Sequence, residues 1–394
     1  MKIGMIFDDE FPPHPRIWNE AFNLMEAGHE VYLYCFDYKG RPKHETLNNL
    51  KIIRSQKSRL IRKFSALAYT TSLYHRIIYK DIAQFVKSYG IEIIHVHNIR
   101  VARAVLYASP NVKMKILDLH ENIPEIMKSY NHVTSFPGKY FIFPSIWKKW
   151  ERRFVLDFDK IIVVTEFAKN DLLENYQIDE KKVIVVPNSV QESFYKSIQL
   201  NNDIITRFSS GFNVLYFGDT GIRRGLETVI RAAEVLKNSI PNIQIIIVGS
   251  STSDDYLKHL TSKLKLDNQI CFEGFQDEKL LQSYITTSNV CISPLLRNRH
   301  HDTTYANKIF QYMALGKPLL VSDCTAQQEI VNRVKCGLIH KAGNINDFVK
   351  KLRWMYENPN KTSEMGLKGQ AFIANEFNQK KQSKEMIDFY NNLN

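Results

Sequence analysis

Short apolar runs rich in β-branched residues alternate with helix-length segments along the whole chain, and this alternation restricts the fold more than any other feature. The first cycle is an expected strand over residues 2–7, a helix over 17–27 and a second strand over 30–34. Such alternation is typical of βαβ units, which build parallel sheets. It predicts an α/β fold of doubly wound, Rossmann-like sheets. Further strands are expected over 91–95, 115–119, 160–164, 183–186 and 213–217, and near 243–248, 270–272, 289–292, 318–321 and 337–339.

One polar stretch, between residues 187 and 211, interrupts the alternation without a clear periodicity of its own. Because 394 residues suffice for two domains of ordinary size, we expect one domain on each side of it. Ligands of doubly wound sheets bind beyond the carboxyl ends of the strands, so a substrate cleft between two facing domains is expected. The expected organisation is an N-terminal domain over 1–188, a linker over 189–211, a C-terminal domain over 212–376 and a C-terminal helix over 377–394 that could return to the N-terminal domain.

The apolar runs of the sequence favour a cytoplasmic protein. The run at the N-terminus covers only residues 3–7 before three acidic residues follow, which is too short for a signal peptide. The longest apolar and aromatic run, residues 140–147, includes Pro144 and falls far short of the roughly 20 residues that span a bilayer. Five cysteines without C-x-x-C spacing favour reduced, buried thiols over a disulfide framework or a zinc ribbon.

The chain is basic, with 53 Lys and Arg against 41 Asp and Glu. This excess favours anionic partners, and charge by itself leaves nucleotides, nucleic acid and an acidic membrane surface open. Two basic segments with aromatic residues suggest an anionic membrane, and the alternative is solvated helix faces with their aromatic residues in the core. Their residues are Lys51, Arg54, Lys57, Arg59, Arg62, Lys63, Phe64, Leu67 and Tyr69 in the first, and Trp147, Lys148, Lys149, Trp150, Arg152 and Arg153 in the second.

A loop rich in glycine and arginine follows the first strand of the second domain. It reads Gly218-Asp219-Thr220-Gly221-Ile222-Arg223-Arg224-Gly225 and leads into a helix near Leu226. Glycines let a backbone approach its ligand, and helix N-termini and guanidinium groups favour anions. The loop therefore predicts a phosphate-bearing ligand, and an ordinary βα loop with solvated arginines is the alternative. The missing G-x-G-x-x-G and G-x-x-x-x-G-K-[ST] fingerprints disfavour a dinucleotide oxidoreductase and a P-loop kinase.

A second polar segment, residues 300–308, runs into a helix that ends at Gly316-Lys317-Pro318. Thr304 is the expected N-cap of this helix. Lys308 and Gln311 are three residues apart and share one helical face. The expected sheet-facing residues are Ile309, Tyr312 and Met313. The start of the helix, which favours anions, therefore carries a cation and an amide.

In their order along the chain, these segments resemble the retaining nucleotide-sugar glycosyltransferases of family 4, of the bacterial polysaccharide-biosynthesis type. The resemblance covers nearly the whole chain and implies the GT-B fold, in which two Rossmann-like domains face a cleft. Five elements carry it: Gly218 to Gly225, Ile247-Val248-Gly249, Phe272-Glu273-Gly274, Ser293-Pro294 and Tyr312-Met313-Ala314-Leu315-Gly316-Lys317-Pro318.

The resemblance implies a donor site in the C-terminal domain. Arg224 is implied on the donor diphosphate with Arg223 close by, and Lys308 near the nucleotide. The full set of implied donor-binding residues is Gly218, Thr220, Gly221, Arg223, Arg224, Gly249, Phe275, Thr303, Lys308 and Gln311.

The chain departs from the family at three positions of this site. Family members often have an arginine where this chain has Asp219, and their paired glutamates fall on Thr303 and Gln311, so both acids are absent. A branch with Thr-Thr-x-Pro-Asn-Lys-x-Phe-Glu-Tyr-Met-Ala is closer, although Ala306 replaces its proline.

In the N-terminal domain the resemblance implies a histidine that faces the donor sugar. Leu119-His120-Glu121 stands where the family has a His-(Asp/Glu) pair at a strand end, which makes His120 the implied catalytic residue. His95 and His97 alternate at the end of another strand, so we expect one to face the cleft and the other to pack; His97 is the acceptor-binding candidate. In the first loop, Pro12-Pro13-His14-Pro15-Arg16, Arg16 could meet an acceptor phosphate or only brace the loop.

The resemblance thus implies a retaining, metal-independent hexosyltransferase that moves a sugar from a nucleotide diphosphate donor to a glycan or polyprenyl-linked acceptor in cell-surface polysaccharide synthesis. No cofactor, no metal and no nucleic-acid partner are expected, because the sequence has no Asp-x-Asp motif and no His/Cys cluster of metal spacing. A peripheral position at the inner face of the plasma membrane is also expected. Two alternatives are an epimerase, which needs paired carboxylates in the cleft, and a non-catalytic scaffold that binds nucleotide sugar.

Overall fold

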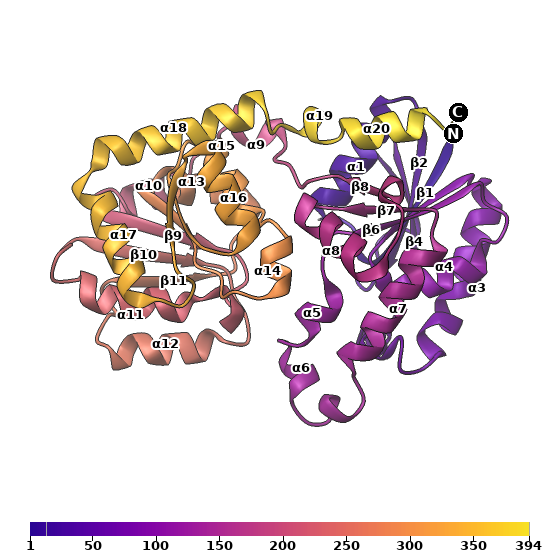
Figure 1. Ribbon diagram of the computed structural model, residues 1–394, viewed down its shortest axis with the longest axis horizontal. Coiled ribbons are helices and arrows are strands. Elements are labelled where there is room, and N and C mark those ends of the chain that lie inside the picture. Colours follow the sequence, from indigo (N-terminus) through magenta and orange to yellow (C-terminus); the bar gives the residue numbers. More distant parts are fainter. Residues whose placement is uncertain (13, 394) are drawn as a thin grey trace. The chain divides into compact units, whose positions relative to one another are not determined.

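The computed structural model describes residues 1–12 and 14–393, so Pro13 of the first loop lies outside the described residues (Figure 1). The chain divides into two compact units. The first unit combines Met1–Pro187 with Gln382–Asn394, and the second is Asn188–Lys381. The C-terminal helix α20 (Lys384–Asn391) therefore belongs to the first unit.

The first unit is built on an eight-stranded sheet with the order β3-β4-β2-β1-β5-β6-β7-β8. All neighbours pair in parallel except β3 and β4, which form an antiparallel hairpin at one edge. The order reverses between β1 and β5, and this is the topological switch point at which doubly wound sheets bind ligands. The strands are β1 (Lys2–Glu10), β2 (Glu30–Asp37), β3 (His44–Leu47), β4 (Leu50–Gln56), β5 (Ile93–His97), β6 (Met114–Leu119), β7 (Lys160–Val163) and β8 (Val183–Val185).

Apolar clusters lie on both faces of this sheet, because successive side chains of a strand point to opposite faces. Ile3 and Met5 of β1 join the cluster that includes residues of α1 and α20, whereas Ile6 joins the cluster of α3, α4 and α7. The longer helices are α1 (Pro15–Glu26), α3 (Leu73–Tyr89), α4 (Ala102–Ala108), α7 (Pro144–Asp157) and α8 (Glu166–Tyr176); the shorter ones are α2 (Arg59–Phe64), α5 (Ile123–Met127) and α6 (Asn131–Thr134).

The second unit has a six-stranded parallel sheet with the order β11-β10-β9-β12-β13-β14. Numbered within the unit, this is the doubly wound order 3-2-1-4-5-6, with its switch point between β9 and β12. The strands are β9 (Phe212–Phe217), β10 (Ile243–Val248), β11 (Ile270–Gly274), β12 (Val290–Ser293), β13 (Leu319–Ser322) and β14 (Gly337–His340). The main helices are α11 (Leu226–Leu236), α12 (Asp254–Lys263), α13 (Leu281–Thr286), α14 (Arg299–Thr303), α15 (Lys308–Ala314), α16 (Thr325–Val334), α17 (Ile345–Glu357) and α18 (Pro359–Asn375).

The α/β class and the two doubly wound sheets are confirmed, and three details differ from the sequence prediction. The strand expected over 91–95 lies two residues later, as β5. The hairpin of β3 and β4 is not among the predicted strands, because β3 is only four exposed or half-exposed residues. Residues 189–211 form the helices α9 (Glu192–Lys196) and α10 (Asn202–Arg207) and belong to the second unit.

Candidate functional site

The switch point of the second unit is lined by glycine backbone. Gly218 directly follows β9 and donates its N–H to the Val248 carbonyl at 2.8 Å, while Gly249 donates to the Gly274 carbonyl at 2.7 Å. Gly249 has φ +129°, and a Cβ there would overlap the carbonyl oxygen of Gly218. The ends of β9, β10 and β11 are therefore held together by backbone hydrogen bonds, and the close approach at Gly249 leaves no room for a side chain.

The loop after β9 packs against the turn after β12. Gly225 has φ +77°, a Cβ on it would overlap the Pro294 carbonyl oxygen, and Leu296 donates its backbone N–H to the Arg223 carbonyl at 3.0 Å. Helix α11 begins at Leu226, as predicted. The fold thus brings two of the predicted elements, the loop 218–225 and the Ser293-Pro294 turn, into direct contact.

Lys308 supplies a buried cation at this point. Lys308 is the first residue of α15 and is 7% exposed. Its Nζ lies 3.6 Å from the centroid of the Tyr216 ring. A Cβ on Gly218 would stand 3.2 Å from Nζ, so the ammonium faces the glycine-lined strand end. Within the described residues, Nζ has no hydrogen-bond partner. Burial, with the charges of Arg224 and Arg223, lowers the pKa of Lys308 well below its usual range.

The two arginines of the loop share one carboxylate. Arg224 donates through Nε to Asp219 Oδ2 at 3.1 Å, and Arg223 donates through Nη2 to the same oxygen at 3.3 Å. Burial would raise the pKa of Asp219, but the arginines and the Gly221 N–H outweigh it and lower that pKa. Both arginine side chains are about four-fifths buried, and their contact with a phosphate-bearing ligand stays a prediction.

His301 was missed by the sequence analysis and extends this site. Its Nδ1 lies 2.7 Å from the Leu296 carbonyl oxygen, so Nδ1 carries the proton and Nε2 accepts a hydrogen bond from Arg223 Nη1 at 3.1 Å. Burial lowers the pKa of His301 to about 4 and keeps the imidazole neutral. Thr220, a predicted donor residue, donates its hydroxyl to Asp254. The one signal for His301 in the sequence was its position within the second polar segment, residues 300–308.

The remaining predicted donor residues occupy different settings. Phe275 is 83% exposed, Gln311 is half-buried one turn after Lys308, and the buried Thr303 donates its hydroxyl to the Arg299 carbonyl at 2.9 Å. Their contacts with a donor stay predictions. The expectation that Thr304 caps the following helix is wrong, because the chain forms the separate helix α14 before it and α15 begins after Asn307.

In the first unit, His120 follows the end of β6, at the carboxyl edge of the sheet. Its ring lies 5.8 Å from the ring of His14, and within the described residues Nε2 is buried without a hydrogen-bond partner. Burial lowers the pKa of His120 well below its usual range, so the imidazole is neutral at pH 7. A neutral imidazole at a strand end can donate or accept one hydrogen bond to a sugar hydroxyl. Its catalytic role stays a prediction.

Arg16 lies inside the first unit and is ion-paired. It donates through Nε and Nη2 to the two oxygens of Asp118 at 2.8 and 2.9 Å, and through Nη1 to the Val186 carbonyl at 2.9 Å. Its Nη2 also lies 2.8 Å from Glu20 Oε1. The bracing interpretation accounts for these contacts, whereas the contact with an acceptor phosphate stays a prediction.

His95 and His97 lie on the same side of β5. Their rings stack at 4.6 Å with an interplanar angle of 15°, and both residues are fully buried. The expectation that one faces outward while the other packs is wrong, because residues two apart on a strand share a face. Glu20 and Asp118 lie beside them, so the fold assembles a group of possible metal ligands that the sequence spacing did not indicate. The role of His97 toward an acceptor stays a prediction.

Fold and local geometry together define a two-unit α/β protein whose second unit has basic side chains beside glycine-lined strand ends. Residues 16–194 match the family described as Glycosyltransferase Family 4, and residues 201–372 match the family described as Glycosyl transferases group 1. The chain is therefore a family 4 glycosyltransferase with the GT-B fold.

Among curated proteins, the uncharacterized glycosyltransferase MJ1069 of Methanocaldococcus jannaschii is 23% identical over 236 residues, which are 60% of this chain and 59% of that protein. The matched part of the chain spans about half the length of the curated relatives it matches. Among solved structures, sucrose-phosphate synthase of Thermosynechococcus elongatus has a TM-score of 0.80 at 16% identity, with 100% of this chain and 98% of that chain covered. HepE of Anabaena in complex with UDP-glucose has a TM-score of 0.73 at 14% identity, with both chains fully covered.

Of the helices in the described part of the chain, none combines the length and the apolar character that a membrane span requires.

Proposed function

We propose that the protein transfers a hexosyl group from a nucleoside diphosphate donor to a glycan or polyprenyl-linked acceptor, with retention of configuration and without a metal on the diphosphate. The buried side chain of Lys308 is the main support for this proposal. A buried ammonium that faces a glycine-lined strand end, and that no carboxylate of the described residues pairs, calls for an anion from outside. HepE, which shares the fold, is known with UDP-glucose bound, and this supports a diphosphate sugar as the ligand.

The proposed chemistry is mainly electrostatic. The bond between the anomeric carbon and the diphosphate oxygen breaks, and negative charge grows on the departing nucleoside diphosphate. Lys308 and the two arginines stabilise that charge in place of a metal ion. The acceptor hydroxyl oxygen bonds to the anomeric carbon on the same face, and its proton passes to the departing diphosphate. His120 holds the sugar by a hydrogen bond and is not an obligatory base. The product enters cell-surface polysaccharide synthesis at the cytoplasmic side of the membrane.

The test is a screen of nucleotide sugars for donor hydrolysis and for transfer to lysate lipids, followed by mass spectrometry. A brief treatment with EDTA should leave the rate nearly unchanged; complete loss that Mg²⁺ or Mn²⁺ restores would contradict metal-independent transfer. His120→Ala should reduce turnover far more than it weakens binding of the free nucleoside diphosphate. Equal losses of both would show a structural histidine instead. Binding of the nucleotide sugar without any turnover would favour the scaffold alternative.

We also propose that an anionic membrane contacts the first unit, through a smaller surface than the sequence suggested. The side chain of Lys63 is outside the described set. Most other cations of the first basic segment pair with acids, such as Lys57 with Asp81. Trp147 of the second segment is 1% exposed in the core, and this favours the core alternative for that helix. The part of these two segments that remains available for membrane contact is helix α2, whose Leu60 is 62% exposed.

A second aromatic segment, missed by the sequence analysis, lies near α2. Phe136 is 80% exposed, Tyr140 and Phe141 are also exposed, and the Phe141 carbonyl accepts a hydrogen bond from Thr70 at 2.9 Å, shortly after α2 in the chain. Exposed aromatic side chains next to lysines suit the interface of an anionic bilayer. Phe136→Ser with Leu60→Ser should reduce flotation with vesicles containing phosphatidylglycerol, whereas Leu367→Ser, an exposed leucine of the second unit, should not. Equal flotation of all variants would remove this surface from the proposal.

A further inference from the structure

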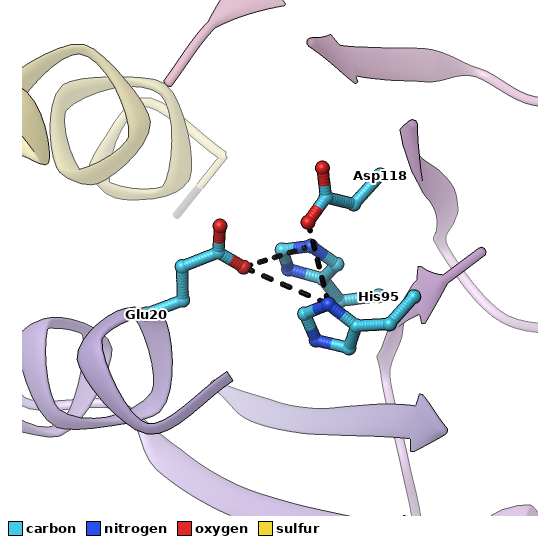
Figure 2. Close-up of side chains that lie close together, drawn as sticks. Glu20, His95 and Asp118 are labelled. Atoms are coloured by element: carbon cyan, nitrogen blue, oxygen red, sulfur yellow. Dashed lines mark ion pairs between the residues drawn. The ribbon is translucent and has the colours of Figure 1, made fainter. Parts of the chain in front are cut away.

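Four side chains of metal-binding type meet at the carboxyl edge of the first sheet (Figure 2). Glu20 comes from α1, His95 and His97 from the end of β5, and Asp118 from β6. One ligand atom from each lies within 4.8 Å of those of the other three, and all four residues are buried. Three elements that are distant in sequence thus converge on one small polar volume.

The spacing suits a tetrahedral ion. His95 Nε2 lies 3.4 Å from Glu20 Oε2, and His97 Nδ1 lies 3.3 Å from Asp118 Oδ2 and 3.9 Å from Glu20 Oε2. Around a zinc ion with bonds of about 2.0–2.1 Å, neighbouring ligand atoms stand about 3.3–3.4 Å apart. The two shorter separations already have that length, the third is longer, and all four ligand atoms lie within 4.8 Å of one another.

The atoms that face this volume lack ordinary partners. Within the described residues, His95 Nε2 and both ring nitrogens of His97 have no hydrogen bond of acceptable geometry, and Glu20 contacts Arg16 and, at 3.4 Å or more, the two histidines. Buried polar atoms are nearly always satisfied, because leaving them unpaired costs stability. Several unpaired nitrogen and oxygen atoms that point at one another indicate a bound species among them.

The surroundings of the group also suit a cation. Glu20 and Asp118 are its two acids, and one guanidinium, that of Arg16, contacts both. A divalent ion would displace any proton that the two carboxyl groups share, because metal ligands bind in their deprotonated form. Two neighbours hold the ligands in place: Arg16 orients Asp118 through two hydrogen bonds, and the Tyr390 hydroxyl lies 3.0 Å from His95 Nδ1. Such outer contacts are typical of metal-ligating histidines and carboxylates.

We propose that Glu20, His95, His97 and Asp118 bind one divalent transition-metal ion, with Zn²⁺ the best fit to two imidazoles and two carboxylates. Mg²⁺ and Ca²⁺ are disfavoured because they prefer oxygen ligands only. The ion is structural: it joins α1 to the ends of β5 and β6, two residues before His120. It is separate from the diphosphate site, so the proposal holds whether or not the transfer reaction is the one proposed above.

The first test is the metal content of the purified full-length protein, measured by inductively coupled plasma mass spectrometry. We expect one zinc ion per chain. Removal of the ion with a strong chelator under mild denaturant, followed by Co²⁺, should give the intense visible absorption of tetrahedral cobalt, and Zn²⁺ should raise the melting temperature of the metal-free protein. Protein without zinc, without a cobalt band and without a melting shift would overturn the proposal and leave a shared proton as the bound species.

The second test compares two buried histidines. His97→Gln should abolish zinc binding, whereas His75→Gln should retain it, because both ring nitrogens of His75 are also unpaired within the described residues but belong to α3. Retention of zinc by His97→Gln would overturn the assignment of ligands. If His97→Gln does not fold, Glu20→Gln serves in its place, and the cobalt and melting experiments on the natural chain decide by themselves.

Discussion

The two units have closely similar strand orders around their switch points, yet the side chains at those points have opposite character. In the second unit, Lys308 faces a glycine-lined strand end, and Arg223 and Arg224 share the carboxylate of Asp219. In the first unit, Glu20 and Asp118 share one guanidinium, that of Arg16, and two histidines complete the group. Topology therefore determines where polar side chains gather, whereas the residue types decide whether basic or acidic groups predominate there.

The largest expected effect comes from breaking the charge balance of the first unit. Asp118→Ala leaves the buried Arg16 without its bidentate partner and should lower the free energy of unfolding by about 3–5 kcal/mol. Three of the four tryptophans, Trp18, Trp147 and Trp150, lie in the first unit, so urea unfolding followed by tryptophan fluorescence reports mainly on it. Asp157→Ala, which breaks the exposed pair with Arg153, should cost less than about 1 kcal/mol. Similar losses in both variants would contradict the buried pair.

The corresponding substitution in the second unit should raise stability instead of lowering it. Lys308→Met removes a buried, unpaired charge, so it should stabilise the unit while weakening nucleoside diphosphate binding by about 1.5–3 kcal/mol. Calorimetry and thermal unfolding measure the two effects. Lys317→Met is the control, because the Lys317 side chain is half-buried and its ammonium donates to the Thr286 carbonyl at 2.7 Å. It should lose stability and keep its affinity. Unchanged nucleotide affinity in Lys308→Met would remove Lys308 from the site.

Lys308 should also make nucleotide binding depend on pH. Its pKa is lowered in the free protein, and a bound diphosphate would raise it again. Between those two pKa values, binding takes up a proton, so affinity should fall as pH rises, by at most about tenfold per pH unit. Calorimetry in buffers of different ionisation enthalpy detects the proton. The same uptake in Lys308→Met would assign it to another group.

A smaller gain is expected when the competing carboxylate is removed. Asp219→Asn frees Arg223 and Arg224 from their shared partner, so it should tighten binding of the nucleoside diphosphate by about 1 kcal/mol. Calorimetry again measures the change, with Asp302→Asn as a control at an acid that pairs with Arg297 instead. Weaker binding by Asp219→Asn would show that the carboxylate positions the arginines more than it competes with phosphate.

The smallest effect is expected at Gln311, where the family has a glutamate. If its amide accepts a bond from a ribose hydroxyl, Gln311→Ala should cost about 0.5–1.5 kcal/mol of nucleotide affinity. Gln311→Leu should cost more, because it leaves ribose hydroxyls against an apolar group. Calorimetry with the free nucleoside diphosphate measures both. Unaltered affinity in the two variants would place Gln311 outside the site and weaken the correspondence by position to the family.

In the glycine-rich loop 218–225, the local sequence was sufficient to predict the turn and the start of the following helix. Gly218, Gly225 and the start of α11 at Leu226 follow from spacing, because turn geometry and helix starts are encoded by neighbouring residues. The segment before α15 was harder. Thr304 looks like an N-cap, yet its hydroxyl donates to the His300 carbonyl, four residues earlier, and Asn298 caps the short helix α14. A competing local hydrogen bond therefore replaced the predicted cap.

The sequence by itself determined the α/β class, most strands, the two sheets and the glycine-rich turn before α11, because periodicity and turn residues act over short distances. Only the tertiary structure decided which side chains lie together at the two switch points. It placed Lys308 over Tyr216, 92 positions earlier in the chain, paired Arg16 with Asp118 across 102 positions, and brought Glu20 beside His95 and His97. Charge balance and burial depend on which distant residues become neighbours, and no local pattern encodes that.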